Sequence, residues 1–331
     1  MVRPACPPFF WGVRRALRLH LALPGDPSAR NGGEKALGRI VGSRGKEPIV
    51  EKWPLGVFAS LDAGLGVKLE VVQELGVPTI HLHAPSKESR TIAKGQEFLR
   101  RLEEIGVRIS VVFGGFTGES YADIPTVAKT VGLVPPETRA ARVQEFKEIS
   151  DFSREVLGVD VVALHLGFIP HDAADPLYQQ VLAVTQEVCD HVAGNQQNLH
   201  LETGQETADA LLQFIADVGR DNLFINFDPA NMILYGTGEP IEALRKVGKY
   251  VRSVHCKDGT WSDQPGVTWG AEVPLGQGDV GMENYLRTLN EIGYTGPLTI
   301  EREIPQEPER QKAEIGAAIN LLKELKAKIL G

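Results

Sequence analysis

Eight short apolar or alternating segments recur between residues 55 and 303, and longer segments with helical spacing separate them. Regular alternation of strands and helices predicts a parallel sheet, because each strand must return to the same edge of the sheet through a helix. This pattern excludes all-helical folds and antiparallel sandwiches. The predicted strands are 55–61, 78–84, 107–113, 160–166, 198–203, 223–228, 250–258 and 297–303.

Glycine marks the joins between the predicted helices and the strands that follow them, since it accepts the left-handed conformation that ends many helices. Asp175 and Pro176 predict a helix start. Eight strands in series need seven joins, and eight units in about 280 residues predict a (β/α)8 TIM barrel. An open doubly wound sheet is the alternative, but no glycine-rich phosphate-binding motif follows the first strand. The seven glycines are Gly76, Gly106, Gly158, Gly194, Gly219, Gly248 and Gly293.

Residues 1–50 are rich in arginine, proline and glycine and show no sustained periodicity. We therefore expect a disordered or poorly ordered N-terminal extension, followed by one barrel domain over residues 51–331. Arg14 and Arg15 precede an apolar stretch, as in a twin-arginine export signal, but charged and polar residues interrupt that stretch. We expect a cytoplasmic protein.

The charge distribution argues against a nucleic-acid substrate. Residues 1–52 hold ten Lys and Arg against four Asp and Glu, which leaves 25 against 39 in the rest of the chain. Phosphate contacts need clustered Lys and Arg, and the acidic remainder does not offer them. The sequence has no apolar run long enough to span a membrane. Its three cysteines, without ligand-like spacing, indicate a reducing compartment.

Polar and apolar residues alternate in at least five of the predicted strands. In residues 198–202, Leu199 and Leu201 share one face, whereas His200 and Glu202 share the other. The apolar face can pack against outer helices, so the polar face must line the inside of the barrel. Such an interior is costly unless its polar groups have partners. A metal ion and a polyhydroxylated ligand would supply them.

Four side chains with metal-ligating groups stand at the ends of four strands: Glu202, Asp228, His255 and Glu301. The carboxyl ends of barrel strands meet at one mouth, where active sites lie. Three carboxylates with one imidazole suit Mn²⁺, Co²⁺ or Mg²⁺, and Zn²⁺ stays open because neutral histidine binds it too. The sequence therefore predicts one divalent metal ion held by these residues.

Five short motifs follow one another along the chain: LETG at 201–204, NFDPANM at 226–232, VHCKD at 254–258, GQGDVG at 276–281 and TIERE at 299–303. As an ordered set they resemble the sugar phosphate isomerase/epimerase family, which has a xylose-isomerase-like TIM barrel. The likeness covers roughly residues 55–325. It implies the Glu–Asp–His–Glu metal site of the ketose 3-epimerases, with Glu202 and Glu301 as both ligands and the catalytic acid/base pair.

The resemblance implies a metal-dependent isomerase or epimerase that acts on a sugar or sugar-like polyol. A divalent ion that binds a carbonyl and a neighbouring hydroxyl stabilises the enediolate formed by proton abstraction. Two carboxylates on opposite sides of the substrate can remove the proton from one face and return it on the other. That transfer gives epimerisation, whereas return to the adjacent carbon gives aldose–ketose isomerisation.

Five further residues are candidates for binding the substrate: His83, His165, Asn231, Lys257 and Asp258. The two histidines end the second and fourth strands. Asn231 stands where these epimerases often carry histidine, and the second strand lacks a Glu that the family often has there, so the subclass and the substrate stay open. Lys257 and Asp258 either bind substrate hydroxyls or form an ion pair within a loop.

Other residues near the predicted mouth have two interpretations or a structural one. We expect His81 to be structural and Cys256 to pack on the outer face of its strand. Residues 276–279 either bind an anion before a helix or form a tight turn. Trp261 and Trp269 either cover the site and stack on a sugar ring or pack within their loop.

Other functions are compatible with the same barrel. An inosose-type dehydratase would use the same metal and proton abstraction and then lose water, and a non-catalytic sugar-binding protein would retain the site without turnover. An apurinic endonuclease needs more His and Asp ligands for three zinc ions, and Asn231 stands where one of those histidines is expected. Which sugar binds, whether it is phosphorylated and which carbon reacts stay open. A homo-oligomer is also compatible with the sequence.

Overall fold

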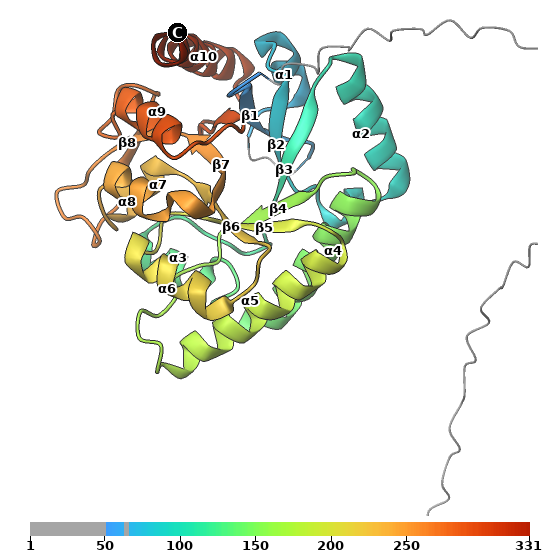
Figure 1. Ribbon diagram of the computed structural model, residues 1–331. Helices are drawn as coiled ribbons and strands as arrows, with labels where there is room; N and C mark the ends of the chain where they lie inside the picture. The colour runs from blue at the N-terminus through green and yellow to red at the C-terminus, as the bar shows by residue number, and fades with distance from the viewer. Residues whose placement is uncertain (1–50, 63–65) are drawn as a thin grey trace, which may run out of the picture. The chain divides into compact units, whose positions relative to one another are not determined.

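The computed structural model describes residues 51–62 and 66–331. Within them, eight parallel strands close into a barrel in the order β1-β10-β7-β6-β5-β4-β3-β2 (Figure 1). Closure through β1 and β10 confirms the predicted TIM barrel and excludes the open sheet. The expected extension, residues 1–50, lies outside the described residues. The barrel strands are β1 (Leu55–Ser60), β2 (Thr79–His83), β3 (Arg108–Gly114), β4 (Val161–Leu164), β5 (Asn198–Glu202), β6 (Leu223–Phe227), β7 (Val251–Cys256) and β10 (Leu298–Ile300).

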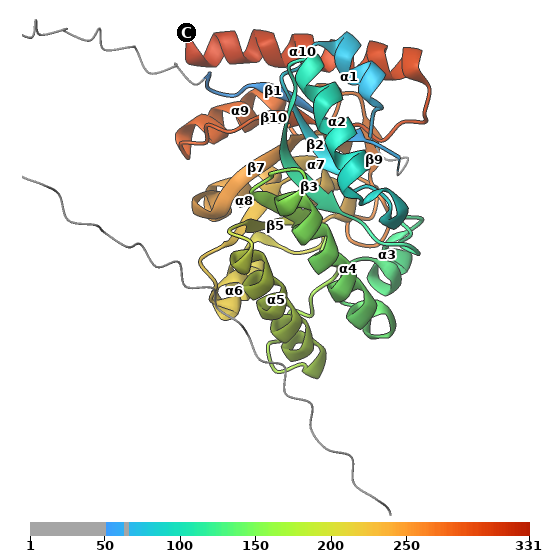
Figure 2. The ribbon, with the colours of Figure 1, turned by 90° about the vertical axis from the view of Figure 1, so that its right-hand side faces the viewer.

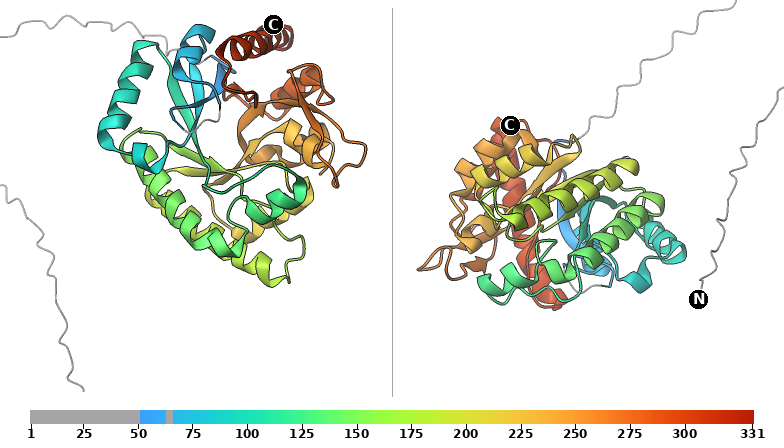
Figure 3. Two further views of the ribbon diagram at one scale, coloured as in Figure 1. Left: turned by 180° about the vertical axis from the view of Figure 1, so that it is seen from behind. Right: turned by 90° about the horizontal axis from the view of Figure 1, so that it is seen from below.

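Helices surround the strands, as the side view and the views from behind and below show (Figures 2 and 3). The C-terminal helix α10 packs beside α1 and α9. In the described part of the chain, no helix is both long and apolar enough to cross a membrane. The helices are α1 (Leu69–Leu75), α2 (Ile92–Glu104), α3 (Ile124–Thr130), α4 (Pro136–Glu155), α5 (Pro176–Gly194), α6 (Ala208–Val218), α7 (Pro229–Tyr235), α8 (Pro240–Val247), α9 (Met282–Glu291) and α10 (Pro308–Leu330), with short 3₁₀ turns at Lys87–Ser89 and Gly248–Tyr250.

The predicted helix boundaries are mostly confirmed. Asp175 caps α5 by accepting a hydrogen bond from the backbone N–H of Leu177 at 2.7 Å. Five of the seven glycines are left-handed, whereas the prediction is wrong for Gly194 and Gly248. Gly194 ends α5 and Gln196 takes the left-handed conformation instead, with φ 58°. Gly248 has φ −51°, and its role is steric, because a Cβ atom there would lie 2.8 Å from Cγ2 of Ile292.

Gly248→Ala should therefore lower the free energy of unfolding by about 1–3 kcal/mol, because the new methyl group would force Ile292 or its helix to move. Gly316, inside α10, is the matched control, since a Cβ atom there meets nothing within 4 Å. Gly316→Ala should raise the stability by about 0.5–1 kcal/mol. Urea unfolding of both variants measures the difference; equal effects would show that Ile292 does not restrict residue 248.

The two faces of the strands carry different cores. The larger apolar cluster lies between barrel and helices and includes Leu199, Leu201 and Cys256, as the alternation predicts. On the inner face, the polar prediction is confirmed for β2, β5, β6, β7 and β10, which bury His81, His200, Asn226, Ser253, His255 and Thr299. On β1, β3 and β4 the interior is instead apolar, with Phe58, Val111, Phe113 and Ala163 as a second small cluster. The barrel interior is therefore polar along the adjacent strands β5, β6, β7 and β10 and mainly apolar along β1 to β4, where β2 contributes His81.

Candidate metal centre

Four side chains meet at the mouth of the polar side of the barrel. One ligand atom from each of Glu202, Asp228, His255 and Glu301 lies within 4.8 Å of the others. Glu202 is the last residue of β5, and His255 is the last but one of β7. Asp228 and Glu301 directly follow β6 and β10. These four strands are consecutive neighbours in the closed barrel. The structure thus brings together the four residues that the sequence predicts.

The imidazole of His255 stands at the centre of this cluster. Its Nδ1 atom lies 2.6 Å from Oε1 of Glu202, 3.1 Å from Oε2 of Glu301 and 3.7 Å from Oδ2 of Asp228. Its other nitrogen, Nε2, lies 3.0 Å from Nδ1 of His81. His81 therefore holds the ring from behind and aims Nδ1 at the carboxylates, as partner groups of metal-binding histidines do.

The electrostatics of the cluster favour the charged forms of His255, Glu301 and Glu202 in spite of burial, whereas burial raises the pKa of Asp228. Burial alone lowers the pKa of His255, but Glu301 and Glu202 outweigh it and raise that pKa well above its usual value. Burial likewise raises the pKa of Glu301, yet Lys257 and His255 bring it down to about 2. The pKa of Glu202 is also lowered, because His165 and His255 outweigh burial. The cluster thus attracts positive charge strongly.

The residues fit a divalent cation. Oδ2 of Asp228 is buried and has no hydrogen-bond partner among the described residues, whereas Oδ1 accepts the backbone N–H of Asn231 at 3.0 Å. A buried carboxylate oxygen without a partner is costly, and a metal ion would remove that cost. Carboxylate oxygens with one imidazole nitrogen are a donor set that suits divalent ions such as Mn²⁺ and Mg²⁺.

Lys257 lies behind Glu301 and forms ion pairs with three carboxylates, of which Glu301 is one. Its Nζ atom lies 2.6 Å from Glu303, 3.4 Å from Glu301 and 3.8 Å from Glu272. Burial lowers the pKa of Lys257, but these carboxylates raise it well above the usual value. Lys257 is therefore a buried cation that keeps Glu301 ionised.

Asp258 does not line the metal cavity. The chain turns after His255 into a hairpin of β8 (Asp258–Thr260) and β9 (Ala271–Val273). The Asp258 carboxylate accepts backbone N–H groups of Gly276 at 2.8 Å, Gly278 at 3.1 Å and Val280 at 3.2 Å. The anion that the segment around residues 276–279 binds is thus the carboxylate of Asp258 itself. The structure therefore assigns Asp258 a structural role in place of substrate binding.

Asp258→Ala should lower the free energy of unfolding by about 3 kcal/mol or more, because it leaves three backbone N–H groups without a charged acceptor. Asp263 lies in the same hairpin loop but is exposed, so Asp263→Ala is the matched control and should change stability little. Denaturant unfolding measures both. A small effect of Asp258→Ala would contradict the structural role.

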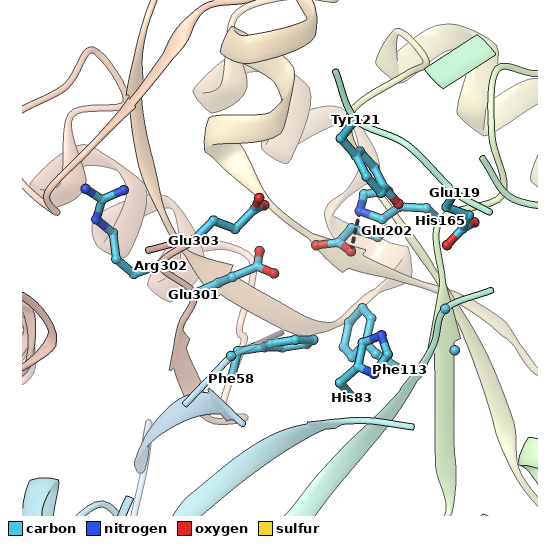
Figure 4. Close-up of a pocket in the computed structure, with 13 residues that line it drawn as sticks. Phe58, His83, Phe113, Glu119, Tyr121, His165, Glu202, Glu301, Arg302 and Glu303 are labelled. Carbon is cyan, nitrogen blue, oxygen red and sulfur yellow. Dashed lines mark ion pairs between the residues drawn. The ribbon is translucent and has the colours of Figure 1, made fainter. Parts of the chain in front are cut away.

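A cavity of about 110 Å³ opens directly above the cluster. Figure 4 shows Glu202 and Glu301 projecting into it from different strands, with the rings of Phe58, Phe113 and His83 below them. Asp228 and His255 are fully buried and do not line the cavity. Within the cluster, only Glu202 and Glu301 are therefore placed to touch a substrate.

Two of the predicted substrate-binding residues, His83 and His165, line this cavity. Nε2 of His165 lies 2.9 Å from Oε2 of Glu202. Burial lowers the pKa of His165, but Glu202 outweighs it and raises that pKa to about 9. At neutral pH His165 is therefore a cation that donates a hydrogen bond to Glu202.

Several lining residues were missed by the sequence analysis: Phe58, Phe113, Glu119, Tyr121 and Glu303. The two phenylalanines carry no polar signal, and Glu119 and Tyr121 lie in the loop between β3 and α3, which has no periodicity. Glu303, inside the TIERE motif, stands two residues after the predicted Glu301.

Glu206, near His165, is a buried carboxyl group that accepts the backbone N–H of Ile169 at 2.9 Å. Burial raises its pKa to about 7, from 4.5. Between these values the folded protein binds a proton that the unfolded chain has lost, so stability falls as pH rises through this window. Glu206→Gln removes that dependence. Relative to wild type, the variant should gain about 2–3 kcal/mol between pH 5 and pH 8, measured by urea unfolding; a constant difference would contradict the raised pKa.

Solved structures similar to this chain share its barrel. A xylose isomerase domain protein from Planctomyces limnophilus is 59% identical, with a TM-score of 0.82 over 84% of this chain and 99% of its own. A xylose isomerase-like TIM barrel protein from Mycobacterium smegmatis, in complex with magnesium, is 21% identical, with a TM-score of 0.58 over 80% and 97%. An L-ribulose 3-epimerase is 18% identical, with a TM-score of 0.61 over 83% and 96%. The last two show a common fold alone.

Curated relatives match parts of the chain. An uncharacterized protein of Methanocaldococcus jannaschii is 23% identical over 51% of this chain, and an inosose dehydratase of Clostridium botulinum is 28% identical over 31%. These matches span 59% and 38% of the relatives' own lengths. The pattern of the xylose isomerase-like TIM barrel family, in contrast, matches residues 68–325. The chain belongs to the xylose isomerase-like TIM barrel family.

Proposed function

We propose that this chain is a divalent-metal-dependent isomerase or epimerase that moves a proton next to the carbonyl of a sugar or sugar-like polyol. One observation carries the proposal. Of the four clustered residues, the two glutamates, Glu202 and Glu301, line the cavity, and each has its own cationic partner. Two carboxylates facing one small cavity, one ionised as the base and the other placed to pass a proton back, are the pair that proton abstraction and return require.

The partners give the two carboxylates matched roles. His165 keeps Glu202 ionised, and Lys257 does the same for Glu301, so either can act as the base at neutral pH. The proton returned on the other face must come from an acid, and the cationic His165 beside Glu202 can supply it. Asp228 and His255 stay buried and would hold the metal from below. A divalent ion there would polarise the substrate carbonyl and a neighbouring hydroxyl and stabilise the enediolate. Mn²⁺, Co²⁺ or Mg²⁺ suit the donors best, and the magnesium complex of the mycobacterial relative supports this choice.

An inosose-type dehydratase is the second candidate. Its metal and its proton abstraction would be the same, but a hydroxyl group would then leave as water. The cationic His165 in the cavity favours this reaction, because it can donate a proton to the leaving hydroxyl. The partial match to an inosose dehydratase supports it as well.

Glu202→Gln and Glu301→Gln should each reduce turnover by about 10²–10⁴-fold, because either change removes one member of the acid/base pair. Glu291→Gln makes the same chemical change on the exposed surface of α9 and should leave turnover unchanged. The assay follows the Mn²⁺- or Mg²⁺-loaded protein with ketoses, aldoses and inososes in D₂O by NMR. Near-normal turnover of both site variants would remove the two carboxylates from the mechanism.

The products of this assay separate the candidate reactions. Carbon-bound deuterium in an unchanged skeleton supports proton transfer, and its position distinguishes epimerisation from aldose–ketose isomerisation. A deoxy-diketone product identifies a dehydratase. Saturable sugar binding without exchange or product in the metal-loaded protein indicates a non-catalytic sugar-binding protein.

A further inference from the structure

A second cavity adjoins the metal cavity and shares three lining residues with it, Tyr121, His165 and Glu303. Its volume is about 310 Å³, nearly three times that of the metal cavity at about 110 Å³. In Figure 4, Tyr121 and Glu303 lie on the side of the metal cavity away from Phe58 and His83. The two cavities are therefore neighbouring compartments of one cleft, with His165 at their common wall.

The wall of this second cavity is aromatic. Trp269, from the loop before β9, packs against Tyr235 at the end of α7, with 4.5 Å between ring centroids and 55° between ring planes. Phe168 supports Tyr235 from another side, edge to face at 5.6 Å. Trp261, the other tryptophan of this loop, lines neither cavity and packs against the main core. Rigid aromatic rings beside a few polar groups are typical of small-molecule sites.

Polar groups stand beside these rings. Asn231 lines the cavity, and its backbone N–H donates a hydrogen bond to Oδ1 of Asp228, so the second cavity is connected directly to the metal cluster. Nε1 of Trp269 is buried and lacks a hydrogen-bond partner within residues 51–62 and 66–331. Because this nitrogen has almost no exposed surface, Trp269 offers a ligand its ring rather than a hydrogen bond. Aromatic faces together with the side chains of Asn231, Glu272 and Glu303 suit the apolar and polar faces of a sugar ring.

The charge of the wall selects against anions. Glu272 and Glu303 both line the cavity, and the nearby cations are engaged by carboxylates: Lys257 by Glu303, and Arg302 by Glu272 at 2.6 Å. His165 is the only potential cation in the lining among the described residues, and Glu202 neutralises it. A phosphate or carboxylate would therefore meet like charge without a free cation.

We propose that this second cavity is a subsite for an uncharged glycosyl ring, so that the substrate is a sugar carrying a second, neutral ring rather than a sugar phosphate. The reacting ring would lie over Glu202 and Glu301, and the second ring would contact Trp269. This inference rests on the proposed function for the reaction itself, whereas the subsite predicts a binding preference that can be measured without turnover.

The test is isothermal titration calorimetry of the Mg²⁺-loaded protein with D-fructose, D-fructose 6-phosphate and three ketose-ended disaccharides: turanose, lactulose and isomaltulose. These disaccharides carry a neutral hexose on different oxygens of fructose. At least one should bind about three- to tenfold more tightly than fructose, the gain expected for aromatic contact, and the phosphate should bind more weakly. Equal affinities of fructose and all three disaccharides, no saccharide binding, or tightest binding of the phosphate would each overturn the subsite.

Variants of the tryptophans test whether Trp269 causes the tighter binding of disaccharides. Trp269→Ala should remove the disaccharide preference and leave fructose affinity unchanged, whereas Trp269→Phe should retain part of it. Trp261→Phe is the matched control in the same loop and should keep the full preference. Circular dichroism shows whether each variant folds. If Trp269→Ala does not fold, the disaccharide preference of Trp269→Phe is compared with that of the wild-type protein. A preference that survives every change at Trp269 contradicts the proposed contact.

Deuterium exchange in the same samples separates the two proposals. A disaccharide preference that depends on Trp269, without exchange on any sugar, would keep the subsite and refute the proposed reaction. Exchange on fructose without any disaccharide preference would keep the reaction and refute the subsite.

Discussion

Three carboxylates around one imidazole nitrogen, two of them buried and the third partly buried, are the constraint on which the rest of the site depends. Nδ1 of His255 has a carboxylate oxygen of Glu202 at 2.6 Å and one of Glu301 at 3.1 Å, and Asp228 completes the group. Such a concentration of charge is unstable without cations and hydrogen-bond partners. His81 behind the ring and Lys257 beside Glu301 supply some of these partners. A divalent ion would supply the rest.

The fold and the four clustered residues could be predicted because both follow from the period of a strand. Side chains alternate whatever the context, so Glu202 and Glu301 had to share the inner face, and barrel closure brought the strand ends together. Strand alternation does not predict the position of Asp258. This residue follows His255 by three positions, but β7 has ended and β8 begins there, so the side chain contacts the 276–279 turn. Residues in loops, such as Tyr121, gave no periodic signal. The phenylalanines that line the cavity are apolar and gave no sign of a functional role.

The surroundings of the cluster bear on what the shared fold leaves open, which is the reaction and its substrate. Similar barrels belong to an L-ribulose 3-epimerase and to a protein in complex with magnesium. Here Asn231 follows the proposed ligand Asp228 and lines the second cavity, and Trp269 and Tyr235 form its aromatic wall. In our proposals, the metal cluster accounts for proton transfer near a carbonyl, and the second cavity determines which sugars bind. The cavities share His165, but Glu301 lines only the first and Trp269 only the second, so the two proposed properties can be altered separately.

The most direct test of the account is a Mn²⁺ titration of the metal-free protein followed by electron paramagnetic resonance. We expect one tightly bound ion per chain with magnetic coupling to an imidazole nitrogen. That coupling should disappear in His255→Ala and persist in His171→Ala, which changes an exposed histidine. Absence of a tightly bound ion, or a nitrogen coupling that survives the loss of His255, would contradict the metal centre described above.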